Sequence, residues 1–282
     1  MISRSARAKI NLGLKIVNKR EDGYHNIETT FTTITLADKL LFDETESGIA
    51  INAPGLKLSQ EENICFKAAD LFKLRYGLRK GVKITLLKNI PVGGGLGGGS
   101  SDAAETLKGL REMTGVNVSD EELMVLSREL GCDVPFFIKG GAAYARGLGD
   151  ELKFFRMPKM SLLIYYPGYA VQTKWAYEEY DKRLLTPAVN LDIIAGDRKK
   201  KKAERTGFTG YGLHNDFEQV VFSAHPDLLD VKAHILASGV FMVSLSGSGS
   251  CLYAVIDEQT KIKAKKYFSD IGAVYFEAES VP

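Results

Sequence analysis

The sequence predicts an α+β protein of two domains, and three observations lead to this prediction. Between residues 8 and 51, apolar and polar side chains alternate over several stretches, which is typical of antiparallel strands. A strand pattern, a run of glycines and a helix pattern follow one another from residue 82 to residue 113. In the last third of the chain, helix and strand patterns alternate. We place the domain boundary so that the domains are residues 1–155 and 156–282.

The composition limits both the architecture and the class of function. The chain has 282 residues, of which 45% are hydrophobic and 26% charged, so it can bury a core in two domains or one large one. Its net charge of +2 gives no broad basic surface for nucleic acid. No run of about 18 apolar residues is present, and no signal-peptide pattern opens the chain. We therefore expect a cytoplasmic protein that binds neither nucleic acid nor membranes.

The cysteines and histidines give no sign of a metal centre. Cys65, Cys132 and Cys251 are far apart, which argues against a disulfide framework or a zinc site and favours reduced thiols. The four histidines are scattered as well. We therefore assign no metal-ligating residue.

The first predicted strand covers residues 8–17, and it places Lys9 and Asn11 on the same face. Such a polar face is usually solvated, and spacing alone favours that interpretation. A turn at residues 20–23 then leads to Tyr24 and His25. Aromatic residues at a loop end are usually packing residues, although exposed ones also stack on bases.

The next elements lead to the glycine run. We expect strands over residues 29–36, 39–42 and 48–51, a helix over 63–76 and a strand over 82–87. A helix over 101–113 follows, with N-cap candidates at Ser100 to Asp102 and Gly115 just past its end.

The glycine run is the most informative stretch, because six of the seven residues from Gly93 to Gly99 are glycine. Each glycine loses more backbone entropy on folding than another residue would, which makes sense where the chain must take positive φ or let a ligand approach. Inward-facing N–H groups and the start of the following helix would bind an anion without a lysine. A flexible linker or a tight turn is the alternative, but the flanking strand and helix patterns disfavour it. We therefore predict a phosphate-binding loop.

Two common glycine motifs fit this run poorly. The nucleotide-binding P-loop ends in Gly-Lys-Ser/Thr, whereas here Gly99 is followed by Ser100. The dinucleotide fingerprint can be aligned with Gly93, Gly95 and Gly98, but no βαβ pattern opens the chain.

Asp133 is the most informative single carboxylate. Ser119 and Glu122 form a capping-box pattern for a helix that Gly131 would end. Asp133 follows, directly before an apolar segment, so it is either a partly buried charge that needs a partner or the N-cap of a short helix. Spacing does not separate these two roles.

The second half of the chain continues the alternation. We expect a strand over residues 161–166, a helix from Trp175, and a solvated basic loop at residues 198–202. Two helices over 215–223 and 226–238, two strands within 241–256 joined by a glycine turn, a helix over 258–269 and a strand over 273–276 complete the chain.

Five motifs together resemble the GHMP small-molecule kinases over almost the whole chain. They are Ala8-Lys9-Ile10-Asn11-Leu12, Asp22-Gly23-Tyr24-His25, Pro91 to Ser101, Gly131-Cys132-Asp133-Val134-Pro135, and Leu245-Ser246-Gly247-Ser248-Gly249-Ser250. The resemblance implies an S5 domain 2-like N-terminal domain that binds ATP and a ferredoxin-like α/β sandwich as the C-terminal domain. It also implies an active site in the interdomain cleft.

The first two motifs resemble the branch of the family that acts on a cytidyl diphosphate substrate. That resemblance implies transfer of the γ-phosphate of ATP to the 2-hydroxyl of a methylerythritol group, in the non-mevalonate route to isoprenoid precursors. Mg²⁺ is implied as the companion of ATP, held through phosphates and few protein oxygens. Another kinase of the family, acting on homoserine, mevalonate or a sugar, is the first alternative. A ligand sensor without catalysis is the second, and either a monomer or a homodimer is compatible with the sequence.

The resemblance also implies roles for individual residues. Asp133 would accept or orient the hydroxyl proton, and Lys9 would lie near Asp133 and the phosphoryl group. Asn11 would bind the substrate or Asp133. Tyr24 would stack on the cytosine and His25 would read it. Three further groups complete the predicted site: Tyr177 as a second wall, the ATP-binding residues Pro91, Gly93, Gly94, Gly95, Leu96, Gly97, Gly98, Gly99, Ser100 and Ser101, and the acceptor-side residues Gly247, Ser248 and Gly249.

Two residues depart from the pattern of the family. Arg7 stands where proline is common, and Asp102 stands where asparagine is common. A carboxylate at residue 102 would repel ATP unless a metal or a basic side chain faces it. We therefore predict that Asp102 points away from the phosphates or contacts the metal.

Overall fold

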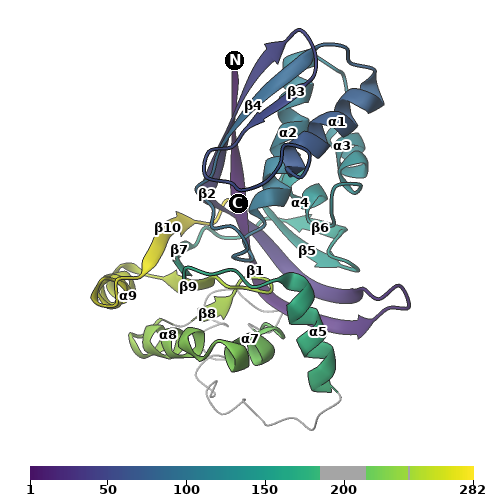
Figure 1. Cartoon of the computed structure of the whole chain (residues 1–282). Helices are drawn as coiled ribbons and strands as arrows, with labels where there is room; N and C mark the ends of the chain where they lie inside the picture. Colours follow the sequence, from purple (N-terminus) through teal and green to yellow (C-terminus); the bar gives the residue numbers. More distant parts are fainter. Residues whose placement is uncertain (185–213, 241) are drawn as a thin grey trace.

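The protein is built on two β-sheets, which occupy the upper and lower parts of Figure 1. This computed structural model describes residues 1–184, 214–240 and 242–282. The predicted basic loop at residues 198–202 lies outside the described residues. Helices pack on both sheets, so the α+β class is confirmed.

The first sheet contains six strands and carries the glycine loop. Its strand order is β3-β4-β2-β5-β6, with β1 paired to β2, and only the β3–β4 pair is parallel. The strands are β1 (Ile2–Lys19), β2 (His25–Thr45), β3 (Ile49–Asn52), β4 (Gly81–Leu87), β5 (Ala142–Arg146) and β6 (Glu151–Phe155). Helices α1 (Ile64–Tyr76), α2 (Gly98–Thr114), α3 (Asp120–Ser127) and α4 (Val134–Lys139) pack on this sheet around a shared apolar core.

The second sheet has four antiparallel strands in the order β10-β7-β9-β8. Counted along the chain this order is 4-1-3-2, which is that of the expected ferredoxin-like sandwich. The strands are β7 (Ser161–Tyr166), β8 (Met242–Leu245), β9 (Leu252–Ile256) and β10 (Val274–Glu279). Helices α7 (Glu218–Ala224), α8 (Pro226–Ala237) and α9 (Glu258–Asp270) pack on this sheet, and α5 (Thr173–Leu184) lies beside α7.

Strand β1 links the two sheets. Ala8, Ile10 and Leu12 are buried in one apolar cluster with Ile164 and Tyr253 of the second sheet. On the opposite face Lys9 and Asn11 are also buried, whereas Lys15 and Val17 are exposed, so the solvated interpretation is wrong for Lys9 and Asn11.

Two later segments add main-chain hydrogen bonds to the first two strands. The N–H of Asp216 donates to the carbonyl of Leu14 at 2.9 Å, and the N–H of Val281 donates to the carbonyl of Thr33 at 2.8 Å.

The structure departs from the expected elements in several places, and strand β1 for example begins at Ile2, six residues before its predicted start. Strands expected over residues 29–36 and 39–42 form one long strand, β2. Strands β5 and β6 were not expected, because the glycine turns around them dominate the local pattern. Helix α2 begins at Gly98, three residues before the predicted start, so two glycines of the loop belong to its first turn.

The first sheet ends at Phe155 and the second begins at Ser161. The boundary between residues 155 and 156 is compatible with this arrangement and stays a prediction. Within the described ranges, every helix is too short or too polar to cross a membrane.

Candidate active site

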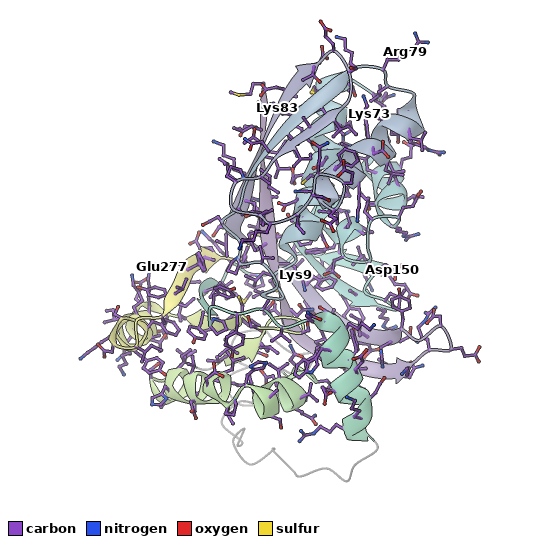
Figure 2. All side chains as sticks on the ribbon, in the orientation of Figure 1. Lys9, Lys73, Arg79, Lys83, Asp150 and Glu277 are labelled. Atoms are coloured by element: carbon purple, nitrogen blue, oxygen red, sulfur yellow. The ribbon has the colours of Figure 1, made fainter. Side chains whose placement is uncertain are left out.

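A cleft of about 1080 Å³ opens where the glycine loop, the β1–β2 hairpin and helix α5 meet. Lys9 lies near the middle of the molecule in Figure 2, on the part of β1 that faces this cleft. Of the residues predicted for the site, all but Ser101 and Gly249 line the cleft. The structure therefore brings the separate sequence motifs into one hollow.

The glycine loop presents free amides at the start of helix α2. Gly97 is the N-cap, with a φ of 68°, and helix α2 follows directly. The N–H groups of Gly98, Gly99 and Ser100 belong to the first turn of the helix, where no intrahelical acceptor exists. The N–H of Ser101 donates to the carbonyl of Gly97 at 2.9 Å, and its side chain lines a different hollow beside β1. This arrangement argues against a main-chain phosphate contact from Ser101.

Two glycines of the loop are required by close packing. A side chain at Gly95 would collide with the carbonyl oxygen of Ser246, and one at Gly97 would come within 3.0 Å of Lys9 Cγ. The loop is held in this place by Lys9 N–H, which donates to the carbonyl of Leu96 at 2.9 Å. The free amides and the ammonium group of Lys9 are therefore adjacent.

Lys9 and Asp133 form the charged centre of the cleft. Lys9 Nζ lies 3.7 Å from Asp133 Oδ2 and 5.0 Å from the centre of the Phe31 ring. The lysine side chain is 6% exposed and the aspartate side chain 33%. Burial lowers the pKa of Lys9, and the charge of Asp133 opposes that shift.

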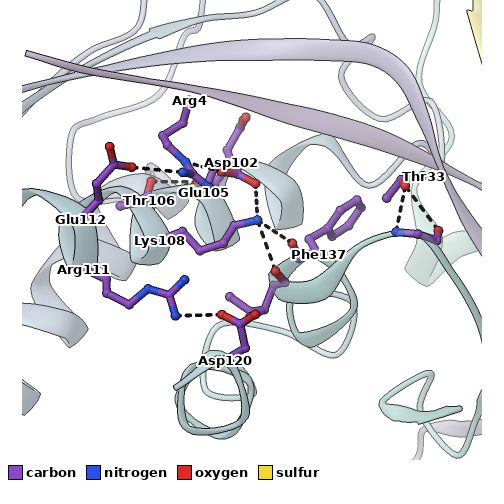
Figure 3. A network of polar contacts seen from close by, with 12 residues as sticks. Arg4, Thr33, Asp102, Glu105, Thr106, Lys108, Arg111, Glu112, Asp120 and Phe137 are labelled. Carbon is purple, nitrogen blue, oxygen red and sulfur yellow. Dashed lines mark hydrogen bonds and ion pairs between the residues drawn. The ribbon is translucent and has the colours of Figure 1, made fainter. Parts of the chain in front are cut away.

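Asp133 occupies the N-cap position of α4, but its side chain makes no capping hydrogen bond. Of the two roles left open by the sequence, the structure favours the partnered charge. Helix α4 is held by helix α2, because Lys108 of α2 donates to the carbonyls of Phe137 and Ile138 at 3.1 and 3.3 Å (Figure 3). Helix α2 therefore both starts at the glycine loop and fixes the helix that follows Asp133.

Asn11 fixes the position of Lys9. Its Oδ1 accepts a hydrogen bond from Lys9 Nζ at 2.6 Å, and its Nδ2 donates to Thr29 Oγ1 at 3.0 Å. Its side-chain hydrogen bonds thus go to Lys9 and Thr29, not to Asp133. A Cβ at Gly247 would lie 3.4 Å from Asn11 Oδ1 and 3.5 Å from Lys9 Nζ, which are ordinary contacts, so Gly247 lies directly against this pair, and its φ of 56° favours glycine there.

Of the other two residues predicted for the acceptor side, one lines the cleft and one does not. Ser248 lines the cleft, and its hydroxyl lies 2.9 Å from Thr173 Oγ1 at the start of α5. Gly249 faces inward, since a Cβ there would lie 3.0 Å from Leu245. Gly249 thus packs against Leu245 and does not line the cleft.

The aromatic end of the cleft combines the hairpin with helix α5. Tyr24 lines the cleft and is 63% exposed, and its stacking role stays a prediction. His25 is buried and stacks on Tyr177, with ring centres 4.6 Å apart and planes at 13°. His25 therefore covers one face of Tyr177, and Phe217 packs against the same ring at an interplanar angle of 80°, with ring centres 4.8 Å apart. Asp181 accepts a hydrogen bond from His25 Nε2 at 2.7 Å.

Asp102 is paired with a lysine. Lys88 Nζ lies 2.8 Å from Asp102 Oδ2 and also contacts Asp38, so one ammonium serves two buried carboxylates. Burial raises the pKa of Asp102 to about 7, Lys88 opposes this shift and Asp38 adds to it. The basic side chain that the sequence required next to Asp102 is Lys88.

The sequence did not single out the apolar end of the cleft or the partner of His25. The apolar end lies beyond the glycine loop and is lined by Leu56, Leu58, Ile64 and Leu86. These residues come from a loop, a helix and a strand, so no local pattern joins them. Asp181 could have been noticed, because it lies four residues after Tyr177 and hence on the same helix face.

Comparison with known proteins assigns both halves of the chain to one family. The model for the GHMP kinases N terminal domain matches residues 63–141, and the model for the GHMP kinases C terminal matches residues 199–273. A protein of Syntrophus aciditrophicus (strain SB) named 4-diphosphocytidyl-2-C-methyl-D-erythritol kinase is 38% identical over 258 residues, which are 91% of this chain and 90% of that protein.

Solved structures agree with this result. A crystal structure of 4-(cytidine 5'-diphospho)-2C-methyl-D-erythritol kinase has a TM-score of 0.82 and 32% identity, and covers 100% of both chains. The Methanococcus jannaschii mevalonate kinase has a TM-score of 0.73 at 14% identity over 100% of this chain and 98% of its own, which concerns the fold alone. The chain is a member of the GHMP kinase family.

Proposed function

We propose that this GHMP kinase phosphorylates the 2-hydroxyl of 4-diphosphocytidyl-2-C-methyl-D-erythritol, in the non-mevalonate route to isoprenoid precursors. Family membership implies that ATP is the phosphate donor. The relatives named for this reaction cover about nine tenths of the chain or more. The observation that carries the proposal is the 3.7 Å contact of Lys9 with Asp133 beside the free amides of the glycine loop.

The chemistry follows from these positions. Asp133 accepts the proton of the acceptor hydroxyl as that oxygen bonds to the γ-phosphorus, and the bond to the β,γ-bridging oxygen breaks so that ADP leaves. Lys9 offsets negative charge on Asp133 and on the transferring oxygens. The amides of Gly98, Gly99 and Ser100 hold the phosphates.

We assign the purine of ATP to one end of the cleft and the cytosine of the substrate to the other. The apolar end beside Leu86 offers a dry surface for the purine of ATP. At the opposite end, the exposed ring of Tyr24 stacks on the cytosine and His25 reads its edge.

Mg²⁺ is part of the proposal, and it would neutralise phosphate charge. The described residues contain no group of three His, Cys, Asp or Glu side chains that could hold a metal. We therefore assign it mainly to phosphate oxygens. A cytoplasmic location stays a prediction, as does the oligomeric state.

A coupled ADP-release assay tests the proposal. The protein is offered the cytidyl substrate, homoserine, mevalonate and galactose separately, each with ATP and Mg²⁺. We expect turnover with the cytidyl substrate and a large fall in kcat/KM for methylerythritol phosphate lacking the cytidyl group. Faster turnover of another acceptor would assign a different kinase, and binding of the cytidyl substrate without ADP release would indicate a sensor.

A further inference from the structure

Asp181 joins the two elements that form the aromatic end of the cleft. It projects from helix α5, and its carboxylate accepts hydrogen bonds from His25 Nε2 and from Lys19 Nζ, each at 2.7 Å. Both donors belong to the β1–β2 hairpin, where Lys19 and His25 are paired across the strands. The His25 side chain is 4% exposed and the Asp181 side chain 24%. The hydrogen bond between them is therefore largely shielded from water.

This contact decides where the imidazole proton lies. An ionised carboxylate can only accept hydrogen bonds, so the ring nitrogen that faces it must carry the proton. In a neutral imidazole, which has one N–H, a proton on Nε2 leaves Nδ1 with a free lone pair. Burial by itself would raise the pKa of Asp181, but hydrogen bonds from Lys19 and His25 outweigh burial and lower that pKa. Asp181 is thus held in the ionised form that this arrangement requires.

The ring is also fixed in its plane. Tyr177, one helical turn before Asp181, stacks on the imidazole with an interplanar angle of 13°. Phe217 supports Tyr177 from another side, with ring centres 4.8 Å apart. Helix α5 therefore sets both the orientation of His25, through Tyr177, and its protonation pattern, through Asp181.

We propose that Asp181 is a positioning residue that makes His25 Nδ1 a hydrogen-bond acceptor and thereby selects a pyrimidine carrying an amino group over one carrying a carbonyl. The inference rests on the proposed function, because it assigns the cytidyl group to this end of the cleft. The amino group of cytosine donates to the lone pair of Nδ1. In a uridyl analogue the carbonyl oxygen at the same ring position places two acceptors against each other, which leaves both unpaired.

Four variants separate this role from a general structural one. Asp181→Leu removes the acceptor at similar size, whereas Asp181→Asn keeps an oxygen that can accept from Nε2. Lys19→Met removes the second donor but leaves the contact between Asp181 and His25. Glu179→Leu is the matched control, because Glu179 belongs to the same helix and pairs with Lys182, away from His25.

The first measurement is kinetic and uses the cytidyl substrate and its uridyl analogue. For Asp181→Leu we expect the preference in kcat/KM for the cytidyl substrate to fall about tenfold or more, mainly through a higher KM. Asp181→Asn should restore most of the preference, and Lys19→Met and Glu179→Leu should keep it. An unchanged preference in Asp181→Leu would overturn the proposal.

The second measurement needs no substrate. Long-range ¹H–¹⁵N NMR on the substrate-free protein at neutral pH reports which imidazole nitrogens are protonated, and loss of a signal in His25→Gln assigns the residue. We expect a proton on Nε2 alone in the wild type and a mixture of tautomers in Asp181→Leu. A proton on Nδ1 in the wild type, alone or together with Nε2, would overturn the proposal. If the wild type shows Nε2–H but no turnover of the cytidyl substrate, the proposed function fails while the assigned tautomer stands.

Discussion

Lys9 Nζ and Asp133 Oδ2 lie 3.7 Å apart, and they join the first strand of the protein to the residue directly before α4. The lysine is almost fully buried, whereas a third of the aspartate side chain remains exposed. The exposed part of the carboxylate faces the cleft, where an acceptor hydroxyl can reach it. Lys9 is thus the buried partner of the pair, and Asp133 is the partner that an acceptor hydroxyl can reach.

Replacing Asp133 tests this arrangement directly. Asp133→Asn should lower kcat by about a thousandfold or more, because the amide cannot take the hydroxyl proton, and should leave ATP affinity within about threefold. ADP release and calorimetric ATP titration measure the two quantities. Asp150→Asn, a nearby carboxylate outside the cleft lining, serves as the control. An equal loss of ATP binding and turnover would indicate a structural role instead.

Burying the charged ammonium of Lys9 should cost folding free energy, although the residue supports activity. Burial lowers the pKa of Lys9 below its unfolded value of 10.5, so the folded state binds this proton more weakly than the unfolded state does. The free-energy cost of burying the charged ammonium is complete below the folded pKa of Lys9. It disappears as the pH rises towards 10.5. Lys9→Met removes this cost but leaves Asn11 Oδ1 without its donor and Asp133 without its cation, so at neutral pH it should be inactive and within about 2 kcal/mol of the wild type in stability.

Urea unfolding at neutral and at alkaline pH checks this prediction. The stability of Lys9→Met relative to the wild type should fall as the pH rises from neutral towards 10.5, because the wild type regains the cost of burying the ammonium. Asn11 keeps its hydrogen bond to Thr29 in the variant, so one anchor of the site is retained. A relative stability that stays constant between neutral and alkaline pH would contradict the prediction.

Asp102 should make stability depend on pH in the opposite direction. Its folded pKa of about 7 lies above the ordinary value of 3.8, so between these limits the folded state holds a proton that the unfolded state has lost. Stability therefore falls as the pH rises through this window. Asp102→Asn leaves Lys88 with Asp38 as one balanced pair, and should be more stable than the wild type by roughly 1–3 kcal/mol at about pH 8.

The difference for Asp102→Asn should be small at about pH 4 and should level off above neutral pH. Urea unfolding across this range measures it. Asp120→Asn is the control, because Asp120 forms a largely exposed pair with Arg111. An advantage of Asp102→Asn that is constant with pH would argue against proton uptake by Asp102.

The glycine loop offers a matched pair of substitutions. Gly95 has a φ of 77° and packs against the carbonyl of Ser246, so Gly95→Ala should lower the free energy of unfolding by about 2 kcal/mol or more and weaken ATP binding. Gly99 lies in the first turn of α2, and the nearest atom to an added Cβ belongs to Ile64 at 3.9 Å. Gly99→Ala should keep or slightly raise stability. Equal losses of stability in the two variants would contradict the close approach at Gly95.

Features held together by neighbouring residues could be predicted from the sequence. The capping box of Ser119 and Glu122 is present as expected, and it depends on interactions within a few residues, which the order of side chains determines. The second-sheet strand at residues 161–166 has the predicted bounds, although its partners β9 and β10 lie far along the chain, because its apolar run is bounded by Pro167 and Gly168.

Features made by distant segments could not be predicted in detail. The partners of Lys88, Asp38 and Asp102, lie 50 and 14 residues away from it. The face of β1 that carries Lys9 and Asn11 looks solvated by spacing, and it is buried only because the glycine loop and Gly247 close over it. Resemblance to a family supplied the residues of the site, whereas the pairing of His25 with Asp181 required coordinates.

The hydrogen bond from Asp216 to Leu14 has a consequence for protein synthesis. Strand β1 emerges first from the ribosome, but its partner at this point is made about two hundred residues later. During translation the nascent N-terminal segment can pair with β2 while the edge at Leu14 stays open. The N-terminal half therefore lacks this hydrogen bond until the C-terminal half has been made.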